Sequence, residues 1–231
     1  MGGLWLILII FTAIGGIVSA TLRNKFNKYS KIPNDAYITG AEAARRMLED
    51  NGIYDVKITS VPGQLTDHYN PVTKTINLSP EVYNGKSIAS VAVAAHETGH
   101  ALQHAHGYAF LKLRSALVPV VSISSTLMNF IFIAGFLFGF IFHLFSTDTI
   151  LLVIILAQGS ITLFSLITLP VEFDASYRGL QWLQNTGIVQ GDKYTLAKDA
   201  LKWAAMTYVV AALAALAQLL YYLAIFTNRR N

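Results

Sequence analysis

Four histidines and a glutamate stand in one short stretch of the sequence that is otherwise small and apolar. The stretch reads VAVAAHETGHALQHAHGY, and within it His96, Glu97 and His100 form the pattern H-E-x-x-H. On a helix, His96 and His100 lie about 40° apart and one turn along the axis, so both imidazoles can reach one cation. Two neutral histidines suit Zn²⁺ and leave positions open for a carboxylate and a water. Glu97 points beside them, where it can accept a proton from that water. The alternative is a polar helix face without a metal.

Two further histidines follow the motif, and neither is predicted to be a ligand. One class of zinc protease uses H-E-x-x-H-x-x-G-x-x-H, but Gln103 stands where that pattern requires glycine. Without a glycine turn the helix continues, and His106 points about 80° from His96, on the far side from His100. His104 lies about 12 Å from His96 along the axis, too far for a metal bond of about 2.1 Å. We expect His104 to make an ordinary polar contact.

A third ligand must come from elsewhere in the chain. The stretch TLPVEFDASYRG, about seventy residues further on, contains Glu172 and Asp174. If it is helical, the two carboxylates lie about 200° apart, so only one of them can face the metal. The residues alone leave open which one it is. A polar cap after Pro170 is the alternative that needs no metal.

Four apolar segments must position these residues. They are long enough to cross a bilayer, which requires about 20 residues, and lie at roughly Leu4–Thr21, Ala116–Phe145, Thr149–Leu169 and Ala205–Phe226. A content of 54% hydrophobic residues is rare in a soluble domain of 231 residues. The second segment is too long for one straight crossing, so it either tilts or bends near Pro119. Because the second and third segments form a hairpin, residue 172 returns to the side that holds His96.

The basic residues predict how these segments are oriented. The first segment has no charged residue before it and four after it, Arg23, Lys25, Lys28 and Lys31, which suits an uncleaved anchor. The sequence VSA before Thr21 is the one feature of a cleavable signal peptide. Most Lys and Arg residues near the segments lie in residues 22–115 and 171–204, whereas Arg229 and Arg230 lie on the other side. By the positive-inside rule, we expect a multi-pass protein of the cell membrane whose large loop is cytoplasmic.

The large loop is predicted to be a small α+β unit. Thr39 and Glu42 form a capping-box pattern that opens a helix to about Asp50. The stretch DVKITSV has strand composition, and QLTDHYNPVTKTINLS predicts a hairpin around Asn70-Pro71. Ser87 begins the helix that carries the histidines, which is expected to end near Gly107. The fold class is therefore an α-helical membrane protein with a small α+β zincin-like domain and about four transmembrane helices.

The expected order of domains follows from these segments. It is a transmembrane anchor at residues 1–21, a catalytic α+β loop at 22–115, a transmembrane hairpin at 116–169, a helical segment with the third ligand at 170–204, and a C-terminal transmembrane helix and tail at 205–231. The absence of cysteine excludes disulfides, thiolate metal sites and cysteine nucleophiles. The net charge of +4 is modest, and no basic run is interleaved with aromatic residues, so nucleic acid is not an expected partner. Basic residues cluster near the apolar segments, which favours a lipid bilayer as partner.

The motifs also carry a resemblance to known proteins. HETGH followed by EFDA resembles the gluzincin membrane proteases, and SIASVAVAAHETGHALQHAHGY, VPGQLTDHYNPVTKTINLS and LPVEFDAS resemble the membrane neutral zinc metallopeptidases known as YugP-like proteins. The resemblance covers nearly the whole chain. It implies one Zn²⁺ held by His96, His100 and Glu172, with Glu97 as the catalytic base. In gluzincins an aspartate follows the ligand glutamate by four residues, whereas Ser176 stands there in this chain, and an aspartate is at position 174.

The function expected from these motifs and from the resemblance is that of a zinc metalloendopeptidase, which cleaves a peptide or membrane-protein substrate. A hairpin strand, Leu65–Tyr69 or Thr75–Ser79, is expected to bind the substrate backbone by edge pairing. Tyr177, Arg178 and His68 are candidates for a further oxyanion donor, and Asp174 and Ser176 are candidates for residues that support the metal ligands. Two alternatives are an intramembrane zinc protease, whose motif helix lies in the bilayer, and a non-catalytic zinc-binding membrane scaffold.

Overall fold

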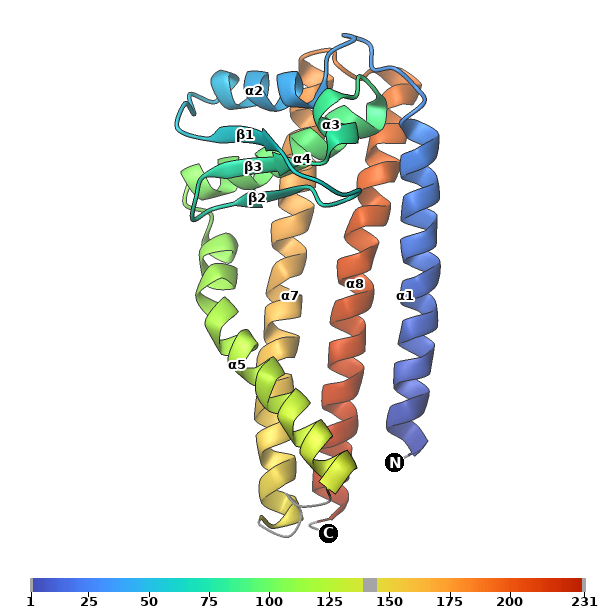
Figure 1. Cartoon of the computed structure of the whole chain (residues 1–231), viewed down its shortest axis with the longest axis vertical. Helices are drawn as coiled ribbons and strands as arrows, with labels where there is room; N and C mark the ends of the chain where they lie inside the picture. The colour runs from blue at the N-terminus through green and yellow to red at the C-terminus, as the bar shows by residue number, and fades with distance from the viewer. Residues whose placement is uncertain (1, 139–144, 230–231) are drawn as a thin grey trace. The chain divides into compact units, whose positions relative to one another are not determined.

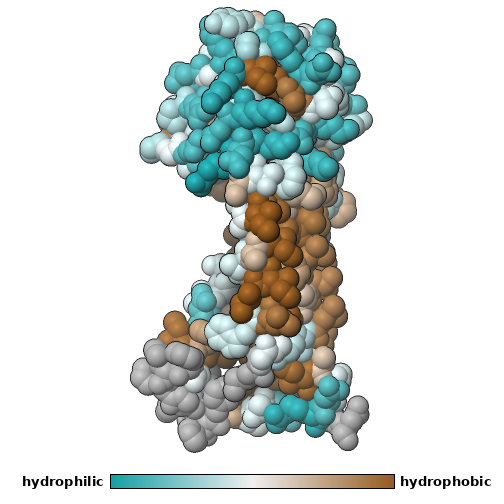
Figure 2. Space-filling model, turned by 90° about the vertical axis from the view of Figure 1, so that its right-hand side faces the viewer, coloured by the Kyte–Doolittle hydropathy of each residue, from teal (hydrophilic) through white to brown (hydrophobic). Residues whose placement is uncertain are grey.

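Long helices carry most of the apolar sequence in this computed structural model, which describes residues 2–138 and 145–229 (Figure 1). Within these residues, four helices are long and apolar enough to cross a bilayer: α1 (Gly2–Tyr29), α5 (Ala109–Phe138), α7 (Thr147–Asn185) and α8 (Gly191–Asn228). Many of their large apolar side chains are exposed, including Ile9, Ile123 and Leu156, and Figure 2 shows a broad apolar surface on one face of the molecule. Such a surface is unfavourable in water and expected in lipid. The predicted fold class, a helical membrane protein with a small α+β part, is confirmed.

The observed helices extend beyond the predicted spans. α1 continues past the expected anchor to Tyr29, and α5 remains helical through Pro119. α7 joins the expected third span to the segment that contains Glu172, with Pro170 inside the helix. The last part of the expected second span, residues 139–144, lies outside the described residues, as does Arg230.

The chain forms two compact units. One consists of Ile17–Lys112 and Pro170–Thr207, and the other holds the remaining described residues. In the second of these units, α7 and α8 are joined by Gln158, whose side-chain amide donates a 3.0 Å hydrogen bond to the Ala215 carbonyl. Thr162 donates to the same carbonyl at 3.1 Å. We name the first unit the α+β unit, since it contains the sheet.

The α+β unit holds a three-stranded sheet, three complete helices and parts of the four long helices. The complete elements are α2 (Gly40–Asp50), β1 (Lys57–Ser60), β2 (His68–Asn70), β3 (Thr75–Leu78), α3 (Pro80–Asn84) and α4 (Ile88–Ala105). The unit also includes residues 17–29 of α1, 109–112 of α5, 170–185 of α7 and 191–207 of α8. The strand order is β1-β3-β2, in which β1 pairs parallel and β2 antiparallel with β3. The expected hairpin is confirmed as β2 and β3, whereas neither α3 nor the parallel pair of β1 and β3 is predicted from the sequence.

Local hydrogen bonds explain where the helices and the hairpin begin. The Thr39 hydroxyl accepts from the Glu42 backbone N–H at 3.1 Å, and the Glu42 carboxylate accepts from the Thr39 N–H at 2.7 Å. This confirms the predicted capping box. Ser87 caps α4 by accepting from the Ser90 N–H at 3.1 Å. In the hairpin turn, the Asn70 side-chain oxygen accepts hydrogen bonds from the backbone N–H groups of Val72 and Thr73, as in an Asx turn.

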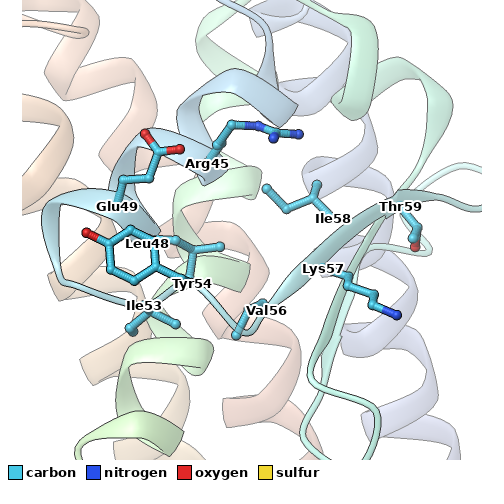
Figure 3. Close-up of a pocket in the computed structure, with 9 residues that line it drawn as sticks. All are labelled: Arg45, Leu48, Glu49, Ile53, Tyr54, Val56, Lys57, Ile58 and Thr59. Carbon is cyan, nitrogen blue, oxygen red and sulfur yellow. The ribbon is translucent and has the colours of Figure 1, made fainter.

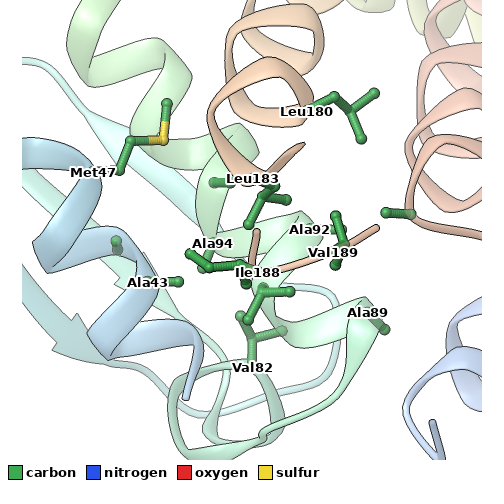
Figure 4. Packing of buried hydrophobic residues seen from close by; sticks show 14 of the residues in the cluster. Ala43, Met47, Val82, Ala89, Ala92, Ala94, Leu180, Leu183, Ile188 and Val189 are labelled. Carbon is green, nitrogen blue, oxygen red and sulfur yellow. The ribbon is translucent and has the colours of Figure 1, made fainter. Parts of the chain in front are cut away.

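The core of the α+β unit surrounds the motif helix. Figure 4 shows part of it, with side chains from α2, α3, α4, α7 and the segment after α7 directed toward one another. Fourteen α4 residues are buried, among them the apolar Ile88, Val91 and Ala95. α4 therefore packs on nearly all sides against α2, α3, the sheet and α7 instead of presenting an apolar face outward.

Candidate metal centre

Two small residues allow α4 and α7 to approach closely. A Cβ atom at Gly99 would lie 2.4 Å from the carbonyl oxygen of Ala175, and one at Gly179 would lie 2.8 Å from the backbone of Ala95. Only glycine tolerates backbone at that distance. Gly99 immediately precedes His100, and Ala175 follows Glu172 by one turn, so this crossing brings residues from the two stretches together.

Three ligand atoms meet at the crossing. His96, His100 and Glu172 each offer one atom, and all of these atoms lie within 4.8 Å of one another. The Glu172 Oε2 atom is 3.4 Å from His96 Nε2 and 3.7 Å from His100 Nε2. Ligand bonds of about 2.0–2.1 Å in a tetrahedral site separate ligand atoms by about 3.3–3.4 Å. The cluster therefore fits a single metal ion, and Glu172 is the carboxylate that joins the histidines.

The other nitrogen of His100 is held by a buried amide. The Nδ1 atom of His100 donates to Gln103 Oε1 at 3.0 Å. Gln103 Nε2 donates to the Val171 carbonyl at 2.7 Å and to Asp174 Oδ2 at 2.8 Å. Because the proton is on Nδ1, the lone pair on Nε2 faces the cluster, as a metal ligand requires.

The equivalent nitrogen of His96 faces a serine. His96 Nδ1 lies 3.0 Å from Ser176 Oγ. Binding of a metal through Nε2 would place the proton on Nδ1, and the Ser176 Oγ atom could accept a hydrogen bond from that N–H. Ser176 follows Glu172 by four residues, so the group beside His96 Nδ1 is a neutral hydroxyl and not a carboxylate.

Glu97 lies close enough to His100 and to Asp67 for its charge to act on both of them. Its side chain is buried, with 7% of the residue exposed. Burial raises the pKa of Asp67, two hydrogen bonds from Ser79 lower it, and the charge of Glu97 raises it again, so that the net shift is upward. The Ser79 N–H donates to Asp67 at 2.7 Å. Asp67, directly before β2, is not singled out by the sequence, where it is one polar residue of the predicted strand Leu65–Tyr69.

His100 carries the electrostatic influence of the Glu172 carboxylate. Burial lowers the pKa of His100, but the nearby Glu172 carboxylate outweighs it and raises the pKa above its usual value. A cation in place of that proton would gain the same attraction. The site therefore favours positive charge between His100 and Glu172.

The candidate oxyanion donors Arg178, Tyr177 and His68 are not part of the three-residue cluster. Arg178 donates to Asp174 at 2.6 Å and is thereby connected through Gln103 to His100. Tyr177 is exposed, and its hydroxyl accepts from Gln181. His68 lies on the sheet, where its ring nitrogens contact the Thr66 carbonyl at 2.8 Å and the Asn77 amide at 3.1 Å.

The two later histidines of the motif helix make contacts away from the cluster. His104 Nδ1 lies 2.8 Å from the Tyr69 hydroxyl, which confirms the expected polar contact. His106 is the C-cap residue of α4, and its Nδ1 lies 3.5 Å from an Arg178 nitrogen. The metal-competent group contains neither of them.

The sheet and the cavities limit where a substrate could bind. β3 pairs with β1 and β2 on its two sides, so, among the residues that the structure describes, β2 is the hairpin strand with a free edge. A cavity of about 440 Å³ lies between α2 and β1 (Figure 3). The residues that line it include none of the three ligand residues, so this cavity is separate from the candidate metal centre.

Comparisons with known proteins agree with a metal site formed by this cluster. Residues 4–227 match the family model described as "Putative neutral zinc metallopeptidase". A protein of Bacillus subtilis (strain 168), described as "Putative membrane protease YugP", is 43% identical over 210 residues, which cover 91% of this chain and 90% of that protein. No solved structure matches the chain.

Proposed function

The chain belongs to the neutral zinc metallopeptidase family, and we propose that it is a membrane-bound zinc endopeptidase. The observation that carries the proposal is the buried cluster of His96, His100 and Glu172, whose ligand atoms are spaced for one tetrahedral ion. Two histidines and a glutamate form a known catalytic zinc set that leaves a position open for water. When bound, Zn²⁺ would polarise the scissile carbonyl and lower the pKa of water from 15.7 to about 7.

Glu97 is proposed as the general base. It follows His96 by one residue and is rotated about 100° from it on the helix, so it lies beside the ligands and not among them. Its carboxylate accepts a proton from the attacking water as the new C–O bond forms. It then gives that proton to the amine nitrogen as the C–N bond breaks.

The substrate is proposed to be an extended peptide or a segment of a membrane protein. The free edge of β2 supports this, because an exposed edge offers backbone donors and acceptors to an added strand. β2 also packs against α4, the helix that carries the histidines. Tyr177 and His68 remain proposals for an oxyanion donor, whereas Arg178 is already paired with Asp174.

We also propose that the α+β unit faces the cytoplasm. Its support is the concentration of Lys and Arg residues in this unit near the ends of the apolar segments. An intramembrane protease is less well supported, because α4 is enclosed by α2, α3 and the sheet. A non-catalytic scaffold would bind zinc without turnover.

The proposed function is tested with Glu97→Gln in the purified full-length protein. The amide preserves shape and removes no metal ligand, so zinc content should equal that of the wild type. It cannot accept the water proton at neutral pH, so peptide hydrolysis should fall by about 10²–10⁴-fold. Glu49→Gln, at an exposed position of α2, is the matched control and should keep both properties. A wild type without zinc, or a zinc-replete Glu97→Gln protein with wild-type turnover, would contradict the proposal.

A further inference from the structure

Gln103 connects the two helices that carry the candidate ligands. It is fully buried, with 0% of the residue exposed. We propose that Gln103 is a positioning residue for the zinc site, an inference that rests on the proposed function. It fixes the orientation of the His100 ring and holds α4 in register with the part of α7 that carries Glu172.

The hydrogen bonds of Gln103 determine which way its amide points. A glutamine amide has two N–H donors and one acceptor oxygen. Nε2 contacts the Val171 carbonyl and the Asp174 carboxylate, both of which can only accept. The opposite orientation would place the amide oxygen against two acceptors, so Oε1 must face His100. Both donors and the acceptor oxygen are therefore used.

The first consequence concerns the His100 ring. Since Oε1 of Gln103 accepts at 3.0 Å, the His100 proton is held on Nδ1 and the ring cannot rotate without losing this bond. The Nε2 lone pair then points toward Glu172, 3.7 Å away. An imidazole held in this way loses less rotational freedom when it binds a metal.

The second consequence concerns the backbone of α7. Val171 directly precedes Glu172, so the 2.7 Å bond from Gln103 to the Val171 carbonyl fixes the chain beside the third ligand. Asp174, two residues beyond Glu172, accepts from Gln103 on one side and from Arg178 on the other. One amide thus ties the second histidine of α4 to both sides of the ligand glutamate.

Gln103 stands at the position where the longer zinc-protease motif H-E-x-x-H-x-x-G-x-x-H has its glycine. In the zinc proteases that take a third histidine from the same stretch, this position is glycine and the chain turns there. In this chain α4 continues to Ala105. The buried amide secures a third ligand that comes from a different helix.

The experiment compares variants of Gln103 by zinc affinity, measured by chelator competition with the full-length protein. Gln103→Met has a similar volume but no donor or acceptor, and we expect zinc affinity to fall about 10–100-fold, as for other groups that support metal ligands. Gln158→Met is the matched control, since Gln158 is also buried but bonds to Ala215 in the other unit. It should keep wild-type affinity.

A second substitution that restores a lost hydrogen bond shows whether Gln103 positions the ligands or only fills space. Gln103→Glu keeps an acceptor for His100 but loses both donors and sets a carboxylate against Asp174, so its zinc affinity should also fall. Adding Asp174→Asn provides an amide that donates to the new carboxylate, and zinc affinity should recover by at least 5-fold, an order-of-magnitude expectation for one restored bond of about 1 kcal/mol. A residue that only fills space would show no such recovery.

The outcomes distinguish this inference from the proposed function. Wild-type zinc affinity in folded Gln103→Met would overturn the positioning role while the peptidase proposal stands. If Gln103→Met does not fold, the Gln103→Glu variant and its double variant decide, and an absence of recovery overturns the role. A wild-type protein that binds no zinc would overturn both.

Discussion

The carbonyl oxygen of Ala175 on α7 lies 2.4 Å from the point that a Cβ atom on Gly99 of α4 would occupy. The second variable position of H-E-x-x-H is therefore filled by the backbone of the helix that supplies Glu172. A glycine that looks like one small residue among many in the sequence sets the distance between the two ligand-bearing helices.

Gly99→Ala should consequently separate α4 from α7 and weaken metal binding. The added methyl group meets backbone atoms, which cannot rotate away, and overpacking of this kind costs about 1–3 kcal/mol. Zinc content and the thermal unfolding temperature of the purified protein should both fall. Gly159→Ala on the same helix α7 is the control, because nothing lies within 4 Å of its Cβ position. Equal zinc content in the two variants would argue against the close crossing.

Glu172 and Asp174 should differ in how strongly they affect zinc. Glu172→Ala removes a ligand atom from the cluster, and zinc should be lost on dialysis. Asp174→Ala removes one acceptor of Gln103 and the partner of Arg178, so zinc should be retained with reduced affinity. Metal analysis after dialysis checks both variants. Equal retention would exclude Glu172 as the third ligand.

Ser176 should tune the affinity through His96. Ser176→Ala removes the acceptor 3.0 Å from His96 Nδ1, and we expect zinc affinity to fall about 10-fold. Ser176→Asp places a charged acceptor beside His96 Nδ1, which makes the imidazole a stronger donor to the metal, so affinity should rise. Chelator competition measures both changes. An identical affinity in all three proteins would show that the contact does not support the ligand.

The orientation in the membrane can be measured by cysteine labelling, since the chain contains no cysteine. Val72, in the hairpin turn, is 91% exposed, and Thr147, at the start of α7, is exposed as well. With a cytoplasmic α+β unit, an impermeant reagent added to intact cells should label Thr147→Cys and spare Val72→Cys. After permeabilisation it should label both. The reverse pattern in intact cells would invert the proposed topology.

The sequence was sufficient for features that depend on nearby residues. The capping box of Thr39 and Glu42 and the Asn70 turn each use atoms a few positions apart, so their residue types predict the local structure. The spans follow from length and hydrophobicity. The separation of His96 from His104 along a helix likewise predicts, without any tertiary contact, that His104 does not bind the same metal ion as His96.

Features that depend on the α4–α7 crossing could not be predicted in this way. From the sequence, Gln103 was informative only because it is not glycine, while its role arises from Val171 and Asp174, about seventy residues away. Helical spacing leaves the choice between Glu172 and Asp174 open for the same reason, since it shows that one faces the metal but not which, and only the family resemblance implies Glu172. The parallel pairing of β1 with β3 also leaves no local signature.

The placement of the ligands on two distant helices also orders the biosynthesis of the site. His96 and His100 emerge from the ribosome about seventy residues before Glu172, a delay of roughly 4–14 s at about 5–20 residues per second. During that interval the nascent chain has two of the three proposed ligands, and α5 must be delivered to the bilayer. The proposed hydrolytic centre therefore cannot be complete on a nascent chain that has not yet reached Glu172.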